Sequence, residues 1–254
     1  MKLVLLGTGT SQGIPVIGCT CKVCTSADHR DHRMRTSAWL EWSGVHLMVD
    51  IGPDFRQQML KFRVPRVDAV LITHHHNDHI AGLDDIRPFN FSQQSSIPIY
   101  GLASTLDSIS KRFDYIFEEE KYPGAPELTL QTVAADSTLT IGDLCIETLL
   151  VHHGTLPILG FRFGPVVYLT DIKYLPDLVI DRIKNCDVLI INALHHNFHP
   201  SHLNLEEALL LIHRIQPGAA YLTHISHHMG LYQEVRAALP DGVHLGYDGL
   251  TIEL

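Results

Sequence analysis

Residues 73–79 read T-H-H-H-N-D-H and form the densest group of potential metal ligands in the sequence. They directly follow the apolar run 69–72, which is typical of a buried strand. Because side chains alternate between the two faces of an extended chain, we expect His74 and His76 to point the same way and His75 the other. A turn after them would bring the carboxylate and the last imidazole of the motif to a second point nearby. Such a density of imidazole and carboxylate ligands predicts two ions, and these ligands suit Zn, Mn, Fe or Ni.

Three further segments place groups of the same chemistry at or just after apolar runs. His152 and His153 end one such run, Asp171 follows a second, and His224 follows a third. Ligands collected from the ends of several strands are positioned by a rigid sheet. The alternative is a solvated histidine-rich turn, but it leaves the other three segments unexplained. The sequence therefore predicts a dinuclear metal site.

The order H-x-H-x-D-H, then a lone His, an Asp and a final His resembles the metallo-β-lactamase superfamily over nearly the whole chain. The resemblance implies an α/β fold, a four-layer αβ/βα sandwich with the metals at one edge of two sheets. We prefer His153 to His152 because His153 directly precedes Gly154, as in the family. The first ion would be bound by His74, His76 and His153, the second by Asp78, His79 and His224, and Asp171 would bridge the two.

A second cluster consists of Cys19, Cys21 and Cys24, three thiols within six residues. Cysteines so close together are poorly placed to pair with one another, and they suit a tetrahedral Zn. The C-x-C-x-x-C spacing, together with T-H-I-S-H at 223–227, resembles the phosphodiesterases of the carbon-phosphorus lyase pathway. That resemblance implies a structural Zn bound by the three cysteines and His227. The alternative is three free thiols in a mobile loop, in a reducing compartment.

Paired divalent ions would leave this site positively charged even after two carboxylates and a hydroxide are counted, and phosphoryl oxygens suit such a site. Such ions lower the pKa of water and stabilise the attacking and leaving oxygens of a displacement. We therefore expect a metal-dependent phosphodiesterase that uses a metal-bridging hydroxide, with Asp78 as a catalytic ligand. The leaving group also needs a proton. His202 matches a family position implicated in acid catalysis or substrate contact, and a surface histidine is the alternative.

Three other features carry less weight. Asp50 resembles a family position beside the metals and would orient a ligand imidazole, unless it only forms a turn. Arg87 could meet substrate phosphate, although an ion pair with Asp84 or Asp85 is the preferred interpretation. The loop 7–13, G-T-G-T-S-Q-G, lacks the lysine of a P-loop and the full dinucleotide spacing, so it does not by itself indicate a phosphate site.

Composition narrows the class of substrate. The chain has 254 residues and a net charge of −9, with no Lys/Arg cluster. This argues against nucleic acid as a partner and against a tRNA 3′-processing-type endonuclease, whose H-E-A-T run is also missing. A small phosphodiester, linear or cyclic, is the expected substrate, with 5-phosphoribosyl 1,2-cyclic phosphate as the family precedent. An oxidising or binding protein like that of pyrroloquinoline quinone synthesis is the other alternative.

The hydrophobic content of 45% fits a globular protein, and we expect one domain, 1–254. No apolar stretch approaches the ~20 residues of a membrane span, and the first residues do not read as a signal peptide. A cytoplasmic protein without membrane contact is therefore expected, and a homodimer is compatible with the sequence.

Short apolar runs alternate with helical patterns along the chain, which predicts mixed α/β structure. Asn204, followed by two glutamates, indicates the start of a helix. We expect strands at 2–6, 37–41, 45–49, 69–72, 97–100, 144–150, 160–162, 166–169, 188–191, 219–222 and 249–253, and helices at 53–62, 104–115, 204–215 and 231–238.

Overall fold

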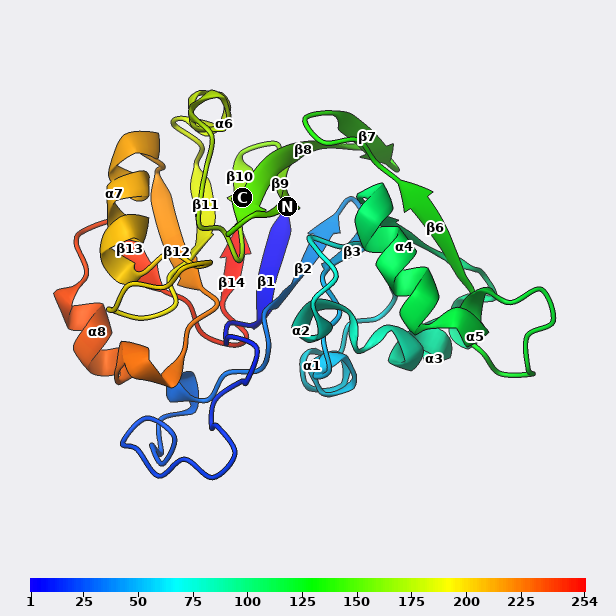
Figure 1. Cartoon of the computed structure of the whole chain (residues 1–254), viewed down its shortest axis with the longest axis horizontal. Helices are drawn as coiled ribbons and strands as arrows, with labels where there is room; N and C mark the ends of the chain where they lie inside the picture. Colours follow the sequence, from blue (N-terminus) through cyan, green and yellow to red (C-terminus); the bar gives the residue numbers. More distant parts are fainter.

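Two seven-stranded sheets lie face to face in the computed structural model, which describes all residues, 1–254, and helices cover the outer surface of each sheet (Figure 1). This is the predicted four-layer αβ/βα sandwich. The first sheet has the order β14 (Thr251–Glu253), β1 (Lys2–Gly7), β2 (Ser37–Trp42), β3 (Val45–Val49), β4 (Ala69–Leu71), β5 (Ile97–Gly101) and β6 (Leu128–Thr132). The second has the order β13 (Val243–Leu245), β12 (Ala219–Thr223), β11 (Val188–Asn192), β10 (Val166–Tyr168), β9 (Leu156–Phe163), β8 (Leu144–His153) and β7 (Thr138–Ile141).

Each sheet has its own set of helices on its outer face (Figure 1). Helices α1 (Phe55–Phe62), α2 (Asn77–Ile80), α3 (Arg87–Gln93), α4 (Ala103–Arg112) and α5 (Asp114–Phe117) accompany the first sheet. Helices α6 (Asp177–Ile183), α7 (Leu205–Ile215) and α8 (Tyr232–Ala238) accompany the second. Short 3₁₀ helices lie at His29–Asp31, Leu83–Ile86 and His227–Met229.

Three layers of buried apolar side chains lie between the four structural layers. Strand β1 contributes to two of them, because its side chains alternate between the two faces of the sheet. Leu3 and Leu5 enter the layer between the sheets, where they join Phe161 of β9, whereas Val4 and Leu6 enter the layer beneath α1. A third layer packs the second sheet against α6, α7 and α8. Strands buried on both faces read as continuous apolar runs, which is why they could be found from the sequence.

The direction of the strands determines where chemistry can be placed. In the first sheet β3, β4, β5 and β6 are parallel, and in the second β10, β11, β12 and β13 are parallel. Parallel strands end at the same edge of their sheet. The loops that follow β4, β10, β11 and β12 therefore gather at one edge of the sandwich, and this edge carries the candidate ligands.

The predicted strands are confirmed with small shifts, but β6, β7 and β13 were not predicted. All three lie at an outer edge of a sheet or are only three residues long, so their pairing depends on a neighbour rather than on a run of their own. The expected helix 104–115 is wrong as one piece, because it breaks at Phe113, where the backbone leaves helical geometry. Helices α2, α3 and α6 were also not predicted.

The start of α7 is confirmed at the predicted residue. The Asn204 side chain accepts a hydrogen bond from Glu207 N at 2.8 Å, and the Glu207 carboxylate accepts one from Asn204 N at 2.9 Å. This reciprocal capping satisfies two backbone donors that the first helical turn leaves free.

The first and last residues lie side by side because β1 pairs with β14 in antiparallel fashion (Figure 1). The Met1 amino group donates to the Leu254 carbonyl oxygen at 2.6 Å.

None of the helices combines the length and the apolar character needed to span a bilayer.

Candidate metal centre

The predicted ligands come from both sheets and meet at the edge described above. The motif 73–79 follows β4 and ends in the short helix α2. His153 is the last residue of β8, Asp171 lies three residues beyond β10, and His224 directly follows β12. Each side chain is therefore fixed by a strand end, which gives the site its rigidity.

The first group contains His74, His76 and His153, whose ligand atoms all lie within 4.8 Å of one another. His74 Nε2 lies 3.0 Å from His76 Nδ1, as expected for side chains on the same face of an extended segment. His75 joins none of the groups, and Arg112 donates to its backbone carbonyl at 3.0 Å. The structure thus separates the three neighbouring histidines as the alternation predicted.

The second group contains Asp78, His79, Asp171 and His224, again with ligand atoms within 4.8 Å of one another. His224 Nε2 lies 2.9 Å from Asp171 Oδ1, and His79 Nε2 lies 3.4 Å from Asp171 Oδ2. Asp171 also lies within 4.8 Å of His153, a member of the first group. Asp171, the carboxylate predicted to bridge two ions, therefore belongs to the second group and lies next to His153 of the first.

The structure distinguishes between His152 and His153. His153 Nδ1 donates to the backbone carbonyl of Ser201 at 2.7 Å, which leaves Nε2 free to face the first group. His152 joins none of the groups, and its ring packs against Tyr174. The geometry therefore favours His153, as the resemblance did.

Asp50 supports the second group from behind. It is fully buried and accepts hydrogen bonds from Thr73 N and Thr73 Oγ1, both at 2.8 Å, and from His79 Nδ1 at 2.7 Å. With its Nδ1–H committed in this way, His79 presents Nε2 towards Asp78 and Asp171. The contact is the one that the orienting role requires, so Asp50 does more than form a turn.

Three residues of the site adopt left-handed backbone conformations that are unusual outside glycine. Asp50, Asp171 and His224 have φ values of 60°, 58° and 54°. Such conformations cost about 1–3 kcal/mol each and persist where the surroundings enforce them, often at functional sites. The strained backbone at these three residues therefore lowers the stability of the fold but directs their side chains to one point.

The second group places two carboxylates and two imidazoles in contact with one another away from solvent. Burial disfavours the charged imidazole of His224, but Asp171 and Asp78 outweigh this effect and raise its pKa to about 9. Burial also opposes ionisation of Asp78 and Asp171, yet the neighbouring histidines hold the pKa of both carboxyls well below the usual range. In the protein alone, protonated histidines thus compensate two buried carboxylates.

The same residues fit divalent cations. His79 Nε2 and His224 Nε2 are buried and face carboxylate oxygens, but neither makes a well-aligned hydrogen bond, and His224 Nδ1 makes none. Poorly satisfied buried polar atoms are costly, and here several converge with carboxylate oxygens on one point. Nitrogen and oxygen donors in this combination suit Zn, Mn, Ni or Fe, and the two adjacent groups, with Asp171 next to His153, fit two ions.

His202 lies between the two groups rather than on the surface. Its side chain is 11% exposed, and its Nδ1 lies 3.7 Å from Asp171 Oδ1. The ring packs against His153 and His224, with ring centroids 4.5 and 4.8 Å apart. Burial, reinforced by His224, lowers the pKa of His202 to about 2, so the imidazole is neutral at pH 7 in the protein alone. The surface-histidine alternative is therefore wrong.

A row of further histidines extends outward from His202, and the sequence did not single them out as functional. The rings of His202 and His199 are 4.9 Å apart, those of His199 and His195 6.0 Å, and those of His195 and His228 6.2 Å. Backbone N–H groups donate to Nδ1 of both His195 and His199, which leaves each Nε2–H free as a donor. The signal that could have found them is the spacing H-H-x-x-H-P-S-H at 195–202.

The structure brings Cys19, Cys21, Cys24 and His227 together, as the sequence predicted. Sγ of Cys19, Cys21 and Cys24 lies 3.4, 3.4 and 3.5 Å from His227 Nδ1, and the four ligand atoms lie within 4.8 Å of one another. A hydrogen bond from the Cys24 backbone and the neighbouring His227 lower the pKa of Cys21 to about 6, whereas burial raises that of Cys24 to about 11. Three thiols and one imidazole in this arrangement fit a tetrahedral Zn, which would tie the N-terminal loop to the residues after β12.

Arg87 forms the predicted ion pair with Asp84, whose carboxylate also accepts a hydrogen bond from Tyr115 Oη at 2.7 Å. The expected ion pair is therefore confirmed, with Asp84 as the partner.

The family model for the beta-lactamase superfamily domain matches residues 46–225, well over half of the chain. The chain belongs to this superfamily and has the fold of its metallo-hydrolases. Within the superfamily it is PhnP-like: a solved diphosphatase from the PhnP family is 35% identical, with a TM-score of 0.93 over 100% of this chain and 97% of that chain.

Two other similar proteins differ from this chain in sequence or in length. Zn²⁺-bound PqqB from Methylobacterium extorquens covers all of both chains with a TM-score of 0.81, but at 21% identity this likeness concerns the fold alone. An octanoyltransferase from Porphyromonas gingivalis is 42% identical over 98% of this chain but only 51% of its own length. The chain thus spans about half of that relative.

Proposed function

We propose that this protein is a dinuclear metal-dependent phosphodiesterase that hydrolyses a small phosphodiester, linear or cyclic. The observation that carries the proposal is the pair of ligand groups that meet where Asp171 lies next to His153 and His202. The 35% identity to a diphosphatase of the PhnP family supports it, because diphosphates and phosphodiesters present similar phosphoryl oxygens to a site.

The division of labour follows from the contacts. His74, His76 and His153 would hold one ion, Asp78, His79 and His224 the other, and Asp171 both. When bound, the two ions would lower the pKa of water and stabilise charge on phosphoryl oxygens. The two carboxylates neutralise only part of the four positive charges of such a pair, so the site attracts an anionic ester.

The surrounding residues orient the ligands. Asp50 fixes the ring of His79 through the 2.7 Å contact at Nδ1, and the Ser201 carbonyl fixes the ring of His153. Contacts of this kind set the tautomer and the direction of a ligand imidazole.

His202 is the group placed to handle the leaving oxygen. It lies beside Asp171 and both ligand groups, and no hydrogen bond within the protein occupies its Nδ1. An anionic substrate next to the ring would stabilise its protonated form and so raise its pKa, which is the change a general acid needs. The Nε2–H of His199, one step further out, is placed to donate to an oxygen of the same substrate.

The test is a panel of small phosphorus esters assayed with protein whose metal content has been measured. We expect hydrolysis of bis-p-nitrophenyl phosphate and of at least one cyclic nucleotide or nucleoside diphosphate ester. Asp171→Asn should abolish it, and Asp136→Asn, at an exposed carboxylate paired with Arg182, should not. Metal-loaded protein that is silent on the whole panel would instead favour an oxidising or binding protein.

A further inference from the structure

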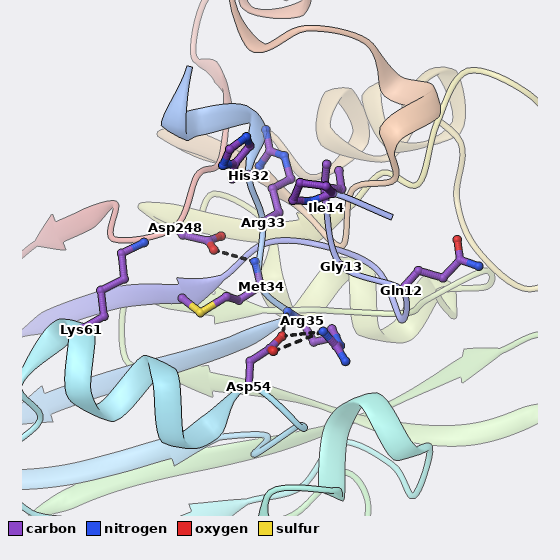
Figure 2. Close-up of a pocket in the computed structure, with 11 residues that line it drawn as sticks. Gln12, Gly13, Ile14, His32, Arg33, Met34, Arg35, Asp54, Lys61 and Asp248 are labelled. Atoms are coloured by element: carbon purple, nitrogen blue, oxygen red, sulfur yellow. Dashed lines mark hydrogen bonds and ion pairs between the residues drawn. The ribbon is translucent and has the colours of Figure 1, made fainter. Parts of the chain in front are cut away.

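A second pocket lies beside the loop 7–13, on a part of the surface that contains none of the residues of the metal groups (Figure 2). Its volume is about 260 Å³. The walls come from the loop itself, from the segment 32–35, from Lys61 near the end of α1 and from Asp248. Figure 2 shows Arg33, Arg35 and Lys61 on different sides of this hollow.

Arg33 is the feature that calls for a ligand. Its side chain is buried, with the residue only 4% exposed, and it forms no ion pair with a carboxylate. Nη1 donates to Thr8 Oγ1 at 2.7 Å and to the Gly246 carbonyl at 2.5 Å, while the other guanidinium nitrogens make no hydrogen bond within the protein. Asp248 and Asp31 lie near enough to attract this charge, but neither forms an ion pair with the guanidinium. A buried cation without a direct ion-pair partner is costly, and an anion in the pocket would offset that cost.

The other charged groups of the pocket leave it cationic. Arg35 pairs with Asp54 at 3.2 Å, but its Nε is buried without a partner. Lys61 forms no ion pair, although its charge acts on Asp248. Asp248 already accepts hydrogen bonds from Thr8 and from Met34 N, so its carboxylate is engaged within the protein. Three cationic side chains thus face two carboxylates, in a chain whose net charge is −9.

We propose that this pocket is a second anion site that binds a phosphate group, either free or as the end of a small phosphate monoester. Guanidinium groups match phosphate oxygens by forked hydrogen bonds, and a lysine adds a point charge. A volume of about 260 Å³ accommodates a phosphate with a few attached atoms. The occupant is distinct from the ester hydrolysed at the metal centre, so this site is independent of the proposed function.

The pocket is close to the metal centre through the backbone. Gly9 pairs on one side with Arg35 and on the other with Ile225, the residue after His224. At Gly52 a Cβ would lie 1.9 Å from the carbonyl oxygen of Asp78 and 3.6 Å from Arg35 Cβ, so only glycine lets these segments approach. The loop 7–13 therefore forms a wall of the anion site and also contacts the segment that carries a metal ligand.

The test combines calorimetry with crystallography on the metal-loaded protein. Titration with inorganic phosphate should reveal a site that weakens about 10-fold in Lys61→Met, the effect expected for one lost charge-assisted contact. Lys111→Met, at an exposed lysine on α4, is the matched control and should leave both affinity and hydrolysis unchanged.

Crystals soaked with tungstate, a heavy analogue of phosphate, should show density in contact with Arg33 in addition to any at the metal centre. A parallel titration with glycerol 3-phosphate distinguishes the two sources, because tighter binding than phosphate would identify a monoester. Tungstate confined to the metal centre, or phosphate affinity that is unchanged in Lys61→Met, would overturn the proposal.

Discussion

His79 and Asp50 are joined by a 2.7 Å contact between Nδ1 and Oδ2, and both side chains are closed to solvent. Thr73 adds two more hydrogen bonds to the same carboxylate. Asp50 therefore keeps the His79 ring in one tautomer and one orientation, with Nε2 facing Asp78 and Asp171. The geometry of the second ligand group therefore depends on Asp50, which is not itself a ligand.

Replacing Asp50 with Asn should weaken metal binding at the second group by about 10- to 100-fold, the usual effect of removing such a partner. The asparagine amide is neutral and can turn an N–H towards the ring, so the preferred tautomer is lost. Metal content after dialysis against graded chelator measures the effect. Asp85→Asn, at an exposed carboxylate, is the control. Equal metal retention by the two variants would contradict the orienting role.

The neighbouring residues His152 and His153 offer a matched pair. His153→Ala should lose metal from the first group and lose hydrolysis, because it removes one of three imidazoles whose ligand atoms lie within 4.8 Å. His152→Ala should keep both, since that ring packs against Tyr174 instead. Elemental analysis beside an activity assay decides the matter, and metal loss only in His152→Ala would reverse the assignment.

His202→Ala should keep its metals but lower kcat by about 10²- to 10⁴-fold on esters with poor leaving groups. The loss should be much smaller on bis-p-nitrophenyl phosphate, because p-nitrophenolate needs little help from an acid. A purely structural role would reduce both rates alike, which makes the comparison informative. His213→Ala, at an exposed histidine on α7, serves as the control.

Much of this site could be predicted from the sequence because its ligands directly follow apolar strands. His74, His153 and His224 each stand where a run of buried residues ends, and such runs are visible without a structure. The αβ/βα sandwich was predicted through the family resemblance that the same ligands carry. The location of Asp78 and His79 on a one-turn helix was not predicted, because α2 is too short to show a helical period.

The supporting contacts could not be predicted for a different reason. The Ser201 carbonyl that orients His153 is a backbone group, so this contact does not depend on which residue occupies position 201 and cannot be read from the sequence. Strand β7 pairs only with β8 at the edge of its sheet, so tertiary context decides its formation. The anion pocket depends on Arg33 lying beside Asp248, which are far apart in the chain and meet only through the fold.

The cysteine cluster should retain one Zn per chain after the active-site metals have been removed by chelator. Cys21→Ser should lose this ion and lower Tm, because the N-terminal loop is then no longer tied to His227. Cys145→Ser, at an exposed cysteine outside the cluster, should change neither. A Zn content near zero in stripped protein that is still folded would show that the thiols are free.

Asp248 predicts a specific dependence of stability on pH. Burial raises the pKa of this carboxyl to about 6 from an ordinary value of 3.8. The folded chain therefore takes up the proton more readily than the unfolded chain, so protonation favours folding. This contribution is complete below about pH 4 and disappears as the pH rises through 6.

Asp248→Asn cannot titrate, so the free energy of unfolding of the wild type minus that of this variant should fall between pH 4 and pH 6. Taking the difference cancels the titration of the histidines and carboxylates that both chains share. Denaturant unfolding at several pH values, with the metals kept saturated, measures it. A difference that stays flat or rises across this interval would mean that Asp248 is ionised throughout, with the nearby Arg33 charge and its three hydrogen-bond donors outweighing burial.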